Sequence, residues 1–429
     1  MSINLLTPLR IILKVSIGYE KIFEDIKSRS FFVRLVFNIH RFLHPNIFST
    51  LMVACYGAKS FLSLSLRDIK EYPIIITANV CNEKKHANFF ADSVGRSKVG
   101  FVNISVRNIV SLSSLKYFIL YCRNLGRVRK YFSVVSYINR KYGFMPACRS
   151  VSMIGFYLRF VEEIKKIDCK AVAVVSDYSP DGLALIYAAR KNSRKIIYMT
   201  HSFIHHHFRV TAQNFDLIFF DGSVSYDNYR NTGKDGQNIG RVVFMGLEGK
   251  SMPIRTSGLR NVNMRIGIFL TAPVNMDKLI YGVDSLKRIW QPENIVIRPH
   301  PEPLARPDFS LIIKDNVVLS TENKLMDDIE RCDIAVVGNT SAVLEILKSG
   351  LPCVYYHGFE GSSWDYCGFV ASGLVPEIKD FQDISIDNIR DFYDRDDWHN
   401  IFLKYDPYYG KSVNKSDIIR KEVDGIMSL

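Results

Sequence analysis

The chain has 429 residues, of which 47% are hydrophobic and 23% are charged. This balance supports packed cores and excludes an intrinsically disordered protein, and the length predicts two domains of roughly 200 residues each. Lys and Arg total 56 against 43 Asp and Glu, so the formal net charge is +13, which indicates an anionic partner or surface. Because the sequence has no recognisable nucleic-acid-binding motif, we expect an anionic lipid surface and no nucleic acid.

Several features of the sequence favour a cytoplasmic location. No apolar run approaches the roughly 20 residues needed to cross a bilayer, and the N-terminus mixes basic and apolar residues instead of separating them as a signal peptide does. The eight cysteines are scattered singly without a Cys-x-x-Cys pair, which is typical of small apolar residues in a reducing compartment.

The N-terminal part is predicted to be helical and basic, with a basic helical segment over residues 1–60. Residues 9–44 have apolar residues at mixed spacings of three and four, which predict one or two helices. These helices either lie on a membrane or pack against the first domain. Residues 107–146 are also predicted to be helical and are rich in Lys, Arg and Tyr. Such a face can bind a glycan or a lipid headgroup, or it can simply be solvated.

Strands and helices alternate further along the chain, which predicts βαβ units and parallel sheets. The strands expected in the first set are 74–80, 99–104, 171–176, 196–199, 216–220 and 241–245. Those expected in the second set are 265–270, 295–297, 317–319, 334–337 and 353–356. The polar, turn-rich stretch 247–262 separates the two sets, and the helical stretch 384–428 can cross back to the first domain. We therefore predict an α/β chain of two doubly wound domains, residues 1–248 and 262–429.

Two expected strands of the second domain end in polar residues. One is followed by Arg298, Pro299, His300 and Pro301, and the strand expected beside it by Gly338, Asn339, Thr340 and Ser341. Ligands of open α/β sheets bind beyond the carboxyl ends of the strands. The helix predicted over 342–348 would also offer unpaired N–H groups and a partial positive charge to an anion. The sequence therefore predicts a phosphate site, which we interpret as the site of a nucleotide.

Each of these residues has a structural alternative. His300 lies between two prolines, so it is either a rigid phosphate ligand or a structural residue of a turn. Thr340 and Ser341 can cap the helix and bind phosphate at the same time. Arg298 either balances phosphate charge or pairs with Glu302, and Glu345 either accepts hydrogen bonds from ribose hydroxyls or is a solvated helix charge.

Three segments resemble known families. "RPHP" at 298–301 and "GNTSAVLEILKSGLPCVYY" at 338–356 resemble the His-Pro and Ser/Thr motifs of bacterial sialyltransferases, polysialyltransferases and Kdo transferases. The same region is similar to teichoic-acid polymerases that use CDP-glycerol, although those have a Thr-Asp-Tyr-Ser-Ser run in place of GNTS. "SDYSPDGLALIYAARKNSRKIIYMTHSFI" at 176–204 resembles a segment of capsule-biosynthesis enzymes, with Ser202 where those families usually have Gly.

The resemblance implies the GT-B fold, in which two Rossmann-like domains face each other across a cleft. It also implies a metal-independent, inverting glycosyltransferase of capsule or lipopolysaccharide biosynthesis. The donor would be a CMP-sugar, CMP-sialic acid or CMP-Kdo, and the acceptor a surface oligosaccharide or a lipid-linked glycan. Such an enzyme would be peripheral on the cytoplasmic face of the bacterial inner membrane.

Other functions remain open. They are a UDP-sugar glycosyltransferase, a CDP-glycerol-type phosphotransferase, a sugar-phosphate epimerase of the same two-domain fold, and a basic membrane adaptor without enzymatic activity.

Sugar transfer requires a base, because the acceptor hydroxyl must lose its proton as the new bond forms. Our candidates, in order, are Asp181, His201 and Asp177, which all lie at predicted strand ends or in the turn that follows. Asp181 can also stabilise a helix N-terminus and Asp177 can form an Asx-turn. The side chains of the run His205-His206-His207 diverge, and Asp394-Arg395-Asp396 lies in a charged helix, so we expect no metal and no cofactor besides the donor.

Overall fold

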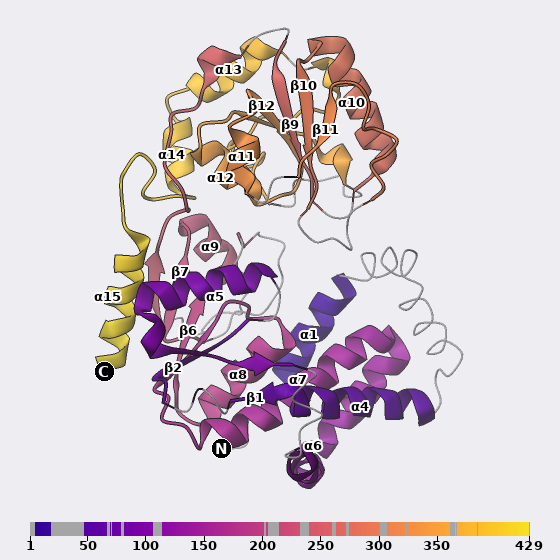
Figure 1. Ribbon diagram of the computed structural model, residues 1–429, viewed down its shortest axis with the longest axis vertical. Coiled ribbons are helices and arrows are strands. Elements are labelled where there is room, and N and C mark those ends of the chain that lie inside the picture. The colour runs from indigo at the N-terminus through magenta and orange to yellow at the C-terminus, as the bar shows by residue number, and fades with distance from the viewer. Residues whose placement is uncertain are drawn as a thin grey trace.

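The computed structural model describes residues 5–18, 47–66, 69, 71–78, 81–105, 114–200, 203–204, 214–231, 240–259, 263–271, 274–300, 307–321, 324–360, 365, 367–383 and 385–428. These residues form two α/β units, one at each end of the long axis of the molecule (Figure 1). Each unit is built on one parallel sheet with helices on both faces. The predicted class, α/β with two doubly wound Rossmann-like domains, is confirmed.

The first domain contains a six-stranded sheet in the order β3-β2-β5-β6-β7-β8. Its strands are β2 (Ile74–Thr77), β3 (Val99–Phe101), β5 (Ala171–Val174), β6 (Lys195–Met199), β7 (Leu217–Phe220) and β8 (Arg241–Phe244). All pairings within it are parallel. A short antiparallel pair joins β1 (Leu64–Ser65) to β4 (Asn103–Ile104). The strands are short runs of β-branched and aromatic residues, as expected where both faces of a parallel sheet are buried.

Alternate residues of each strand enter two different cores. Val172 and Val174 of β5 lie in the core formed with α7 (Phe144–Ile164) and α8 (Pro180–Lys191). Ala171 and Ala173 lie on the opposite face, in the core formed with α5 (Cys81–Val94) and α15 (Lys415–Ser428). The period of two therefore distributes the apolar residues between the two helical layers.

The N-terminal helices form an additional layer around α7. They are α1 (Leu6–Gly18), α4 (Ile47–Ser63) and α6 (Ser114–Tyr142). Leu9, Ile12 and Val15 of α1 are buried in the core of the first domain, so packing against that domain is the interpretation that holds for the start of the segment 9–44. Residues 19–46 lie outside the described residues. The contact between α4 and α7 is close, because a Cβ at Gly155 would collide with the backbone carbonyl of Gly57.

The second domain contains a five-stranded parallel sheet in the order β11-β10-β9-β12-β13. Its strands are β9 (Arg265–Phe269), β10 (Asn294–Arg298), β11 (Val317–Leu319), β12 (Ile334–Val337) and β13 (Cys353–Tyr355). Its helices are α10 (Met276–Trp290), α11 (Leu325–Ile329), α12 (Ala342–Lys348), α13 (Ile386–Asp394) and α14 (Trp398–Leu403). The chain runs from β9 to one side and later returns to the other, so the crevice between β9 and β12 is the topological switch point of this sheet.

The strand order corrects one expectation from the sequence. The strands that precede His300 and Asn339 were predicted to be neighbours, but β9 pairs with both β10 and β12 and separates them. The first strand of a doubly wound domain occupies the centre of the sheet, which the linear sequence does not reveal.

The last helix returns to the first domain, as the sequence allowed. Ile419 and Val423 of α15 are buried against the first sheet, and Asp424 accepts a bond from Lys98 of the first domain at 2.8 Å. The predicted second domain, 262–429, therefore ends in a helix that packs on the other unit. None of the helices in the described parts of the chain combines the length and apolar composition needed to cross a membrane.

Candidate functional site

The loop between β12 and α12 lies at the switch point of the second sheet and contains Gly338, Asn339, Thr340 and Ser341. Glu360 packs directly beneath it, and its carboxylate accepts a hydrogen bond from the Asn339 N–H at 2.7 Å. A Cβ at position 338 would meet this carboxylate, so any residue other than glycine would require the Glu360 side chain to move. Burial raises the pKa of Glu360 to about 7, although the bond from Asn339 opposes the shift. Glu360 therefore fixes the shape of the loop and can hold a proton near neutral pH.

The backbone of this loop has fewer N–H groups available to an anion than the sequence suggests. The N–H groups of Asn339, Thr340 and Ala342 bond to Glu360, to the Gly338 carbonyl and to the Thr340 hydroxyl. The helix that follows is also only seven residues long. The side-chain hydroxyl of the exposed Ser341 and that of the half-buried Thr340 are therefore the groups with which this loop can bind a phosphate.

The two predicted site residues at the end of β10, Arg298 and His300, have different surroundings. Arg298 forms an ion pair with the buried Asp328 of α11, which also accepts a bond from the Ser320 hydroxyl at 2.6 Å. The Asp328 carboxylate thus ties β10, the end of β11 and α11 together, and Glu302 lies outside the described residues. His300 is half-buried at the same strand end, and Pro301 lies outside the described residues.

Glu345 faces the space between the two domains. It lies one turn along α12 from Ser341, and its carboxylate interacts electrostatically with Lys85 of α5 and with Glu248. Burial raises its pKa, opposed mainly by Lys85. Within the described residues no hydrogen-bond donor to this carboxylate is found, so it can accept bonds from hydroxyl groups of a ligand.

In the first domain, Asp181 lies at the switch point of the sheet. It opens α8 after β5, and one carboxylate oxygen accepts a bond of 2.6 Å from the hydroxyl of Thr77 at the end of β2. The adjacent strands β2 and β5 continue to opposite sides of the sheet, which is the arrangement that creates a ligand crevice. Asp181 is only 2% exposed.

Asp177 belongs instead to the interior of the first domain. It is 1% exposed and accepts bonds from the hydroxyls of Tyr229 at 3.1 Å and Tyr198 at 3.4 Å. Burial raises the pKa of Asp177 to about 6 against these two hydrogen bonds. The packing and hydrogen bonds of Asp177 are those of a structural residue within the core. The remaining base candidate, His201, lies outside the described residues.

Metal binding has no support in the described part of the chain, where no group of three or more His, Cys, Asp or Glu residues could hold an ion. Asp394 accepts a bond from the Thr256 hydroxyl at 3.0 Å, and Arg395 pairs with Asp397. The run His205-His206-His207 lies outside the described residues.

Two further residues with site properties escaped the sequence analysis. Glu360 follows a strand by several residues, and only the folded chain brings it under the 338–341 loop. Asp221 directly follows β7, and burial raises its pKa to about 6 although Lys415 opposes the shift. A carboxylate at a strand end was a signal for Asp221, whereas nothing local pointed to Glu360.

Comparisons with known proteins leave the family open. No protein-family model matches the sequence, and no curated protein matches it. Among solved structures, the glycosyltransferase SnogD from Streptomyces nogalater is 12% identical with a TM-score of 0.41, over 82% of this chain and 99% of that one. The S. aureus MnaA–UDP co-structure is 12% identical with a TM-score of 0.46, over 84% and 98%. UDP-GlcNAc 2-epimerase from Methanocaldococcus jannaschii is 10% identical with a TM-score of 0.46, over 83% and 99%. Values this low do not identify an activity.

Proposed function

We propose that the protein is an inverting glycosyltransferase that moves a sugar from a nucleotide donor, preferably a CMP-sugar, to a bacterial surface glycan or its lipid-linked precursor. The observation that carries this proposal is the polar loop 338–341 at the switch point of the second sheet, with the half-buried carboxylate of Glu345 one turn away. This pairing of hydroxyls and a carboxylate suits a phosphate next to a ribose.

The donor would lie across the ends of β10, β9 and β12. Neighbouring strands are about 4.8 Å apart, so the ends of β10 and β12, which precede His300 and Ser341, are separated by roughly 10 Å, with β9 between them. Two side chains at this separation can hold a nucleotide that spans the crevice, with its phosphate between them. Glu345 would then accept bonds from ribose hydroxyls, and a bound phosphate would favour the protonated form of Glu360.

Transfer requires a base on the acceptor side. Asp181 would take the proton of the acceptor hydroxyl as its oxygen bonds to the anomeric carbon, while the bond to the donor phosphate breaks and its electron pair leaves with the nucleotide. His201 is the second candidate. Because Asp181 is 2% exposed, acceptor binding would have to open a path to it, and domain movement is the usual means.

The same crevice could accept a UDP-sugar, and a CDP-glycerol phosphotransferase or an epimerase would need a similar nucleotide site. An anion site with only one histidine and two hydroxyls suits the single phosphate of CMP better than a diphosphate. This preference is testable by direct binding.

We expect calorimetry to show CMP binding that weakens by about 1.5–3 kcal/mol in His300→Ala and in Ser341→Ala, because each removes a hydrogen bond to a charged group. His399→Ala and Ser349→Ala are matched controls. His399 is exposed on α14, and Ser349 lies at the opposite end of α12 from Ser341. Tighter binding of UDP than of CMP would contradict the choice of a CMP-sugar as donor. CMP binding that neither substitution changes would contradict the proposed binding site.

We expect Asp181→Asn to lower turnover at least ~100-fold with little change in donor affinity, because the amide cannot accept the acceptor proton. Initial rates of nucleotide release in the presence of acceptor measure this. Near-normal turnover of this variant together with an inactive His201→Ala would transfer the role to His201.

Asp177→Asn is the control for that experiment. Its folded-state pKa of about 6 is above the usual 3.8, so the protonated carboxyl stabilises the fold below about pH 4 and this contribution disappears as the pH rises through 6. Relative to Asp177→Asn, the free energy of unfolding of the wild type should fall by up to about 3 kcal/mol over this range. Urea titrations at a series of pH values would show it, and turnover at a pH where the variant is folded should change little.

Membrane association is part of this proposal because of α6. The helix contains no Asp or Glu, and its basic residues are Lys116, Arg123, Arg127, Arg129, Lys130, Arg140 and Lys141. On one face, Ile119 and Tyr137 are 46% and 50% exposed beside the exposed Arg123, Arg140 and Lys141. An apolar and basic face of this kind suits an anionic lipid surface.

We expect the protein to sediment with anionic liposomes, with binding that weakens as salt increases. Reversing the charge of Arg123, Arg140 and Lys141 with Glu should weaken partitioning at least about tenfold, since each basic residue near such a surface contributes about 1 kcal/mol. The same reversal at the exposed Lys278, Lys314 and Lys379 of the second domain is the control. Equal binding to neutral and anionic vesicles would contradict the electrostatic role.

A further inference from the structure

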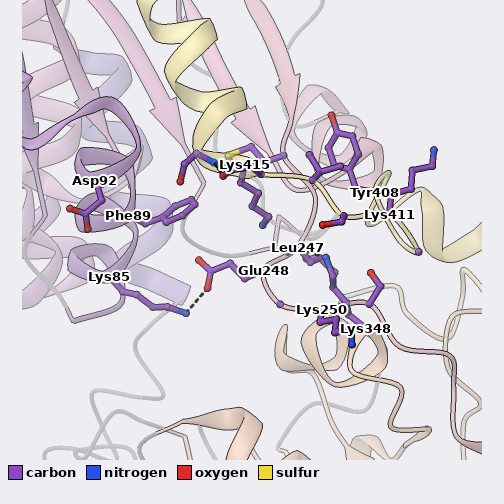
Figure 2. Close-up of a pocket in the computed structure, with 18 of the residues that line it drawn as sticks. Lys85, Phe89, Asp92, Leu247, Glu248, Lys250, Lys348, Tyr408, Lys411 and Lys415 are labelled. Carbon is purple, nitrogen blue, oxygen red and sulfur yellow. Dashed lines mark hydrogen bonds and ion pairs between the residues drawn. The ribbon is translucent and has the colours of Figure 1, made fainter.

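A large cavity lies where the chain crosses between the two domains (Figure 2). Its volume is about 1040 Å³, which is enough for several sugar rings. Its walls come from α5, from the first crossing segment (residues 245–259), from the end of α12, and from the second crossing segment (residues 404–414) with the first turn of α15. Both domains therefore contribute to it.

The lining is strongly basic. It includes Lys85, Lys250, Lys348, Lys411 and Lys415, against the acidic Asp92 and Glu248. Both acids have partners, because Asp92 bonds to Arg96 and Glu248 pairs with Lys85 at 3.2 Å. Counted over the lining residues alone, five lysines stand against two carboxylates, while Asp221 and Asp406 interact with Lys415 without being part of the lining.

Three of these lysines form no ion pair within the described residues, although Lys415 has Asp221, Glu248 and Asp406 in its electrostatic surroundings. Lys348 is buried and pairs with Asp406 at 2.7 Å, but no ion pair is found for Lys250, Lys411 or Lys415 in the parts of the chain that the structure describes. Lys250 and Lys411 are exposed at the rim. Lys415 points into the middle of the cavity, toward Glu248 and Leu247 (Figure 2), and burial lowers its pKa, opposed mainly by Asp221. Glu248 and Asp406 oppose this shift as well, and an anionic group of a ligand beside Lys415 would add to their effect.

The other lining residues are of the kinds that bind saccharides in proteins. Asn88, Asn414 and Ser412 are exposed hydrogen-bonding groups. The Ser251 hydroxyl is shielded from solvent and has no hydrogen-bond partner in the described structure. The half-buried rings of Phe89 and Tyr408 supply apolar surface for the faces of sugar rings.

The cavity lies close to the proposed donor site. Ser341 and Lys348 lie at opposite ends of α12, about 10 Å apart at 1.5 Å per residue. Glu345, between them, interacts electrostatically with Lys85 and Lys415, which line the cavity. A ligand in the cavity is thus one or two sugar rings from a sugar attached to the donor phosphate.

From this arrangement we propose that the cavity binds an acidic saccharide, a chain with carboxylate or phosphate groups that belongs to the acceptor. The identification of this saccharide as the acceptor rests on the proposed glycosyl transfer, whereas its binding in the cavity does not. Lysines bind such groups as point charges, and the exposed stretch 410–414 leaves the cavity open for the rest of the chain. Nucleic acid is a poorer fit, because the lining has no arginine and few aromatic residues.

The probe is hexagalacturonate, with its full methyl ester as the uncharged counterpart of the same shape. We expect calorimetry to show that the acid binds at least about tenfold more tightly than the ester, and that Lys250→Gln/Lys411→Gln/Lys415→Gln weakens binding of the acid by about tenfold or more. The triple variant Lys278→Gln/Lys314→Gln/Lys379→Gln removes the same charge from the second-domain surface and should change the affinity by less than about twofold.

Equal affinity for acid and ester, unchanged binding by the cavity variant, or no binding of the acid would each overturn the proposal. Inorganic phosphate that binds as tightly as the hexamer would overturn the assignment to a saccharide. CMP binding by the cavity variant should match the wild type, which also shows that the variant is folded. If the wild type binds the acid in this lysine-dependent way but binds no nucleotide, the transferase proposal fails while the saccharide site stands.

Discussion

The buried ammonium of Lys348 joins the three segments on which the arrangement of the two domains depends. Lys348 is the last residue of α12. Its ammonium donates to the carbonyl of Leu247 in the first crossing segment at 2.7 Å and pairs with Asp406 in the second crossing segment at 2.7 Å. Removing one partner of such a buried pair typically costs about 3–5 kcal/mol. Backbone bonds from Met252 to the Lys348 carbonyl and from Arg255 to the Gly350 carbonyl, both 2.8 Å, hold the first crossing against the same helix end. The helix that begins at the proposed donor loop is thus fixed at the junction of the domains.

This position gives α12 a central place in the function we propose. Its first residues follow the loop shaped by Glu360, its middle presents Glu345 to the space between the domains, and its end borders the basic cavity. A donor at one end and an anionic acceptor at the other would be aligned along one short, rigid element. The first domain contributes Lys85 and Glu248 to the same space, so substrates would contact both halves of the chain.

Much of the fold was predictable because its signals are local. Short β-branched runs that stop at polar residues marked the strands, and the turn-rich stretch 247–262 marked the separation of the sheets. Strand order was not predictable, because the sequence does not say that β9 lies between β10 and β12. The same limit applies to the site. Asn339, Thr340 and Ser341 could be found from a strand end, but Glu360 reaches their loop, and Asp328 reaches Arg298, only through tertiary contacts. Of the N–H groups expected to be free at the start of α12, that of Asn339 bonds to Glu360, which the sequence could not place, and those of Thr340 and Ala342 bond to acceptors within the loop itself.

The central claim is that a nucleotide binds at the carboxyl ends of β10 and β12. Hydrogen exchange measured by mass spectrometry, with CMP, CDP, UDP, GDP and dTDP added separately, tests this without knowledge of the sugar or the acceptor. The account predicts slower exchange in peptides that cover residues 338–345, with CMP the most effective of the five. It would be contradicted if none of these nucleotides slowed exchange there, or if protection appeared only around residues 174–181 of the first domain.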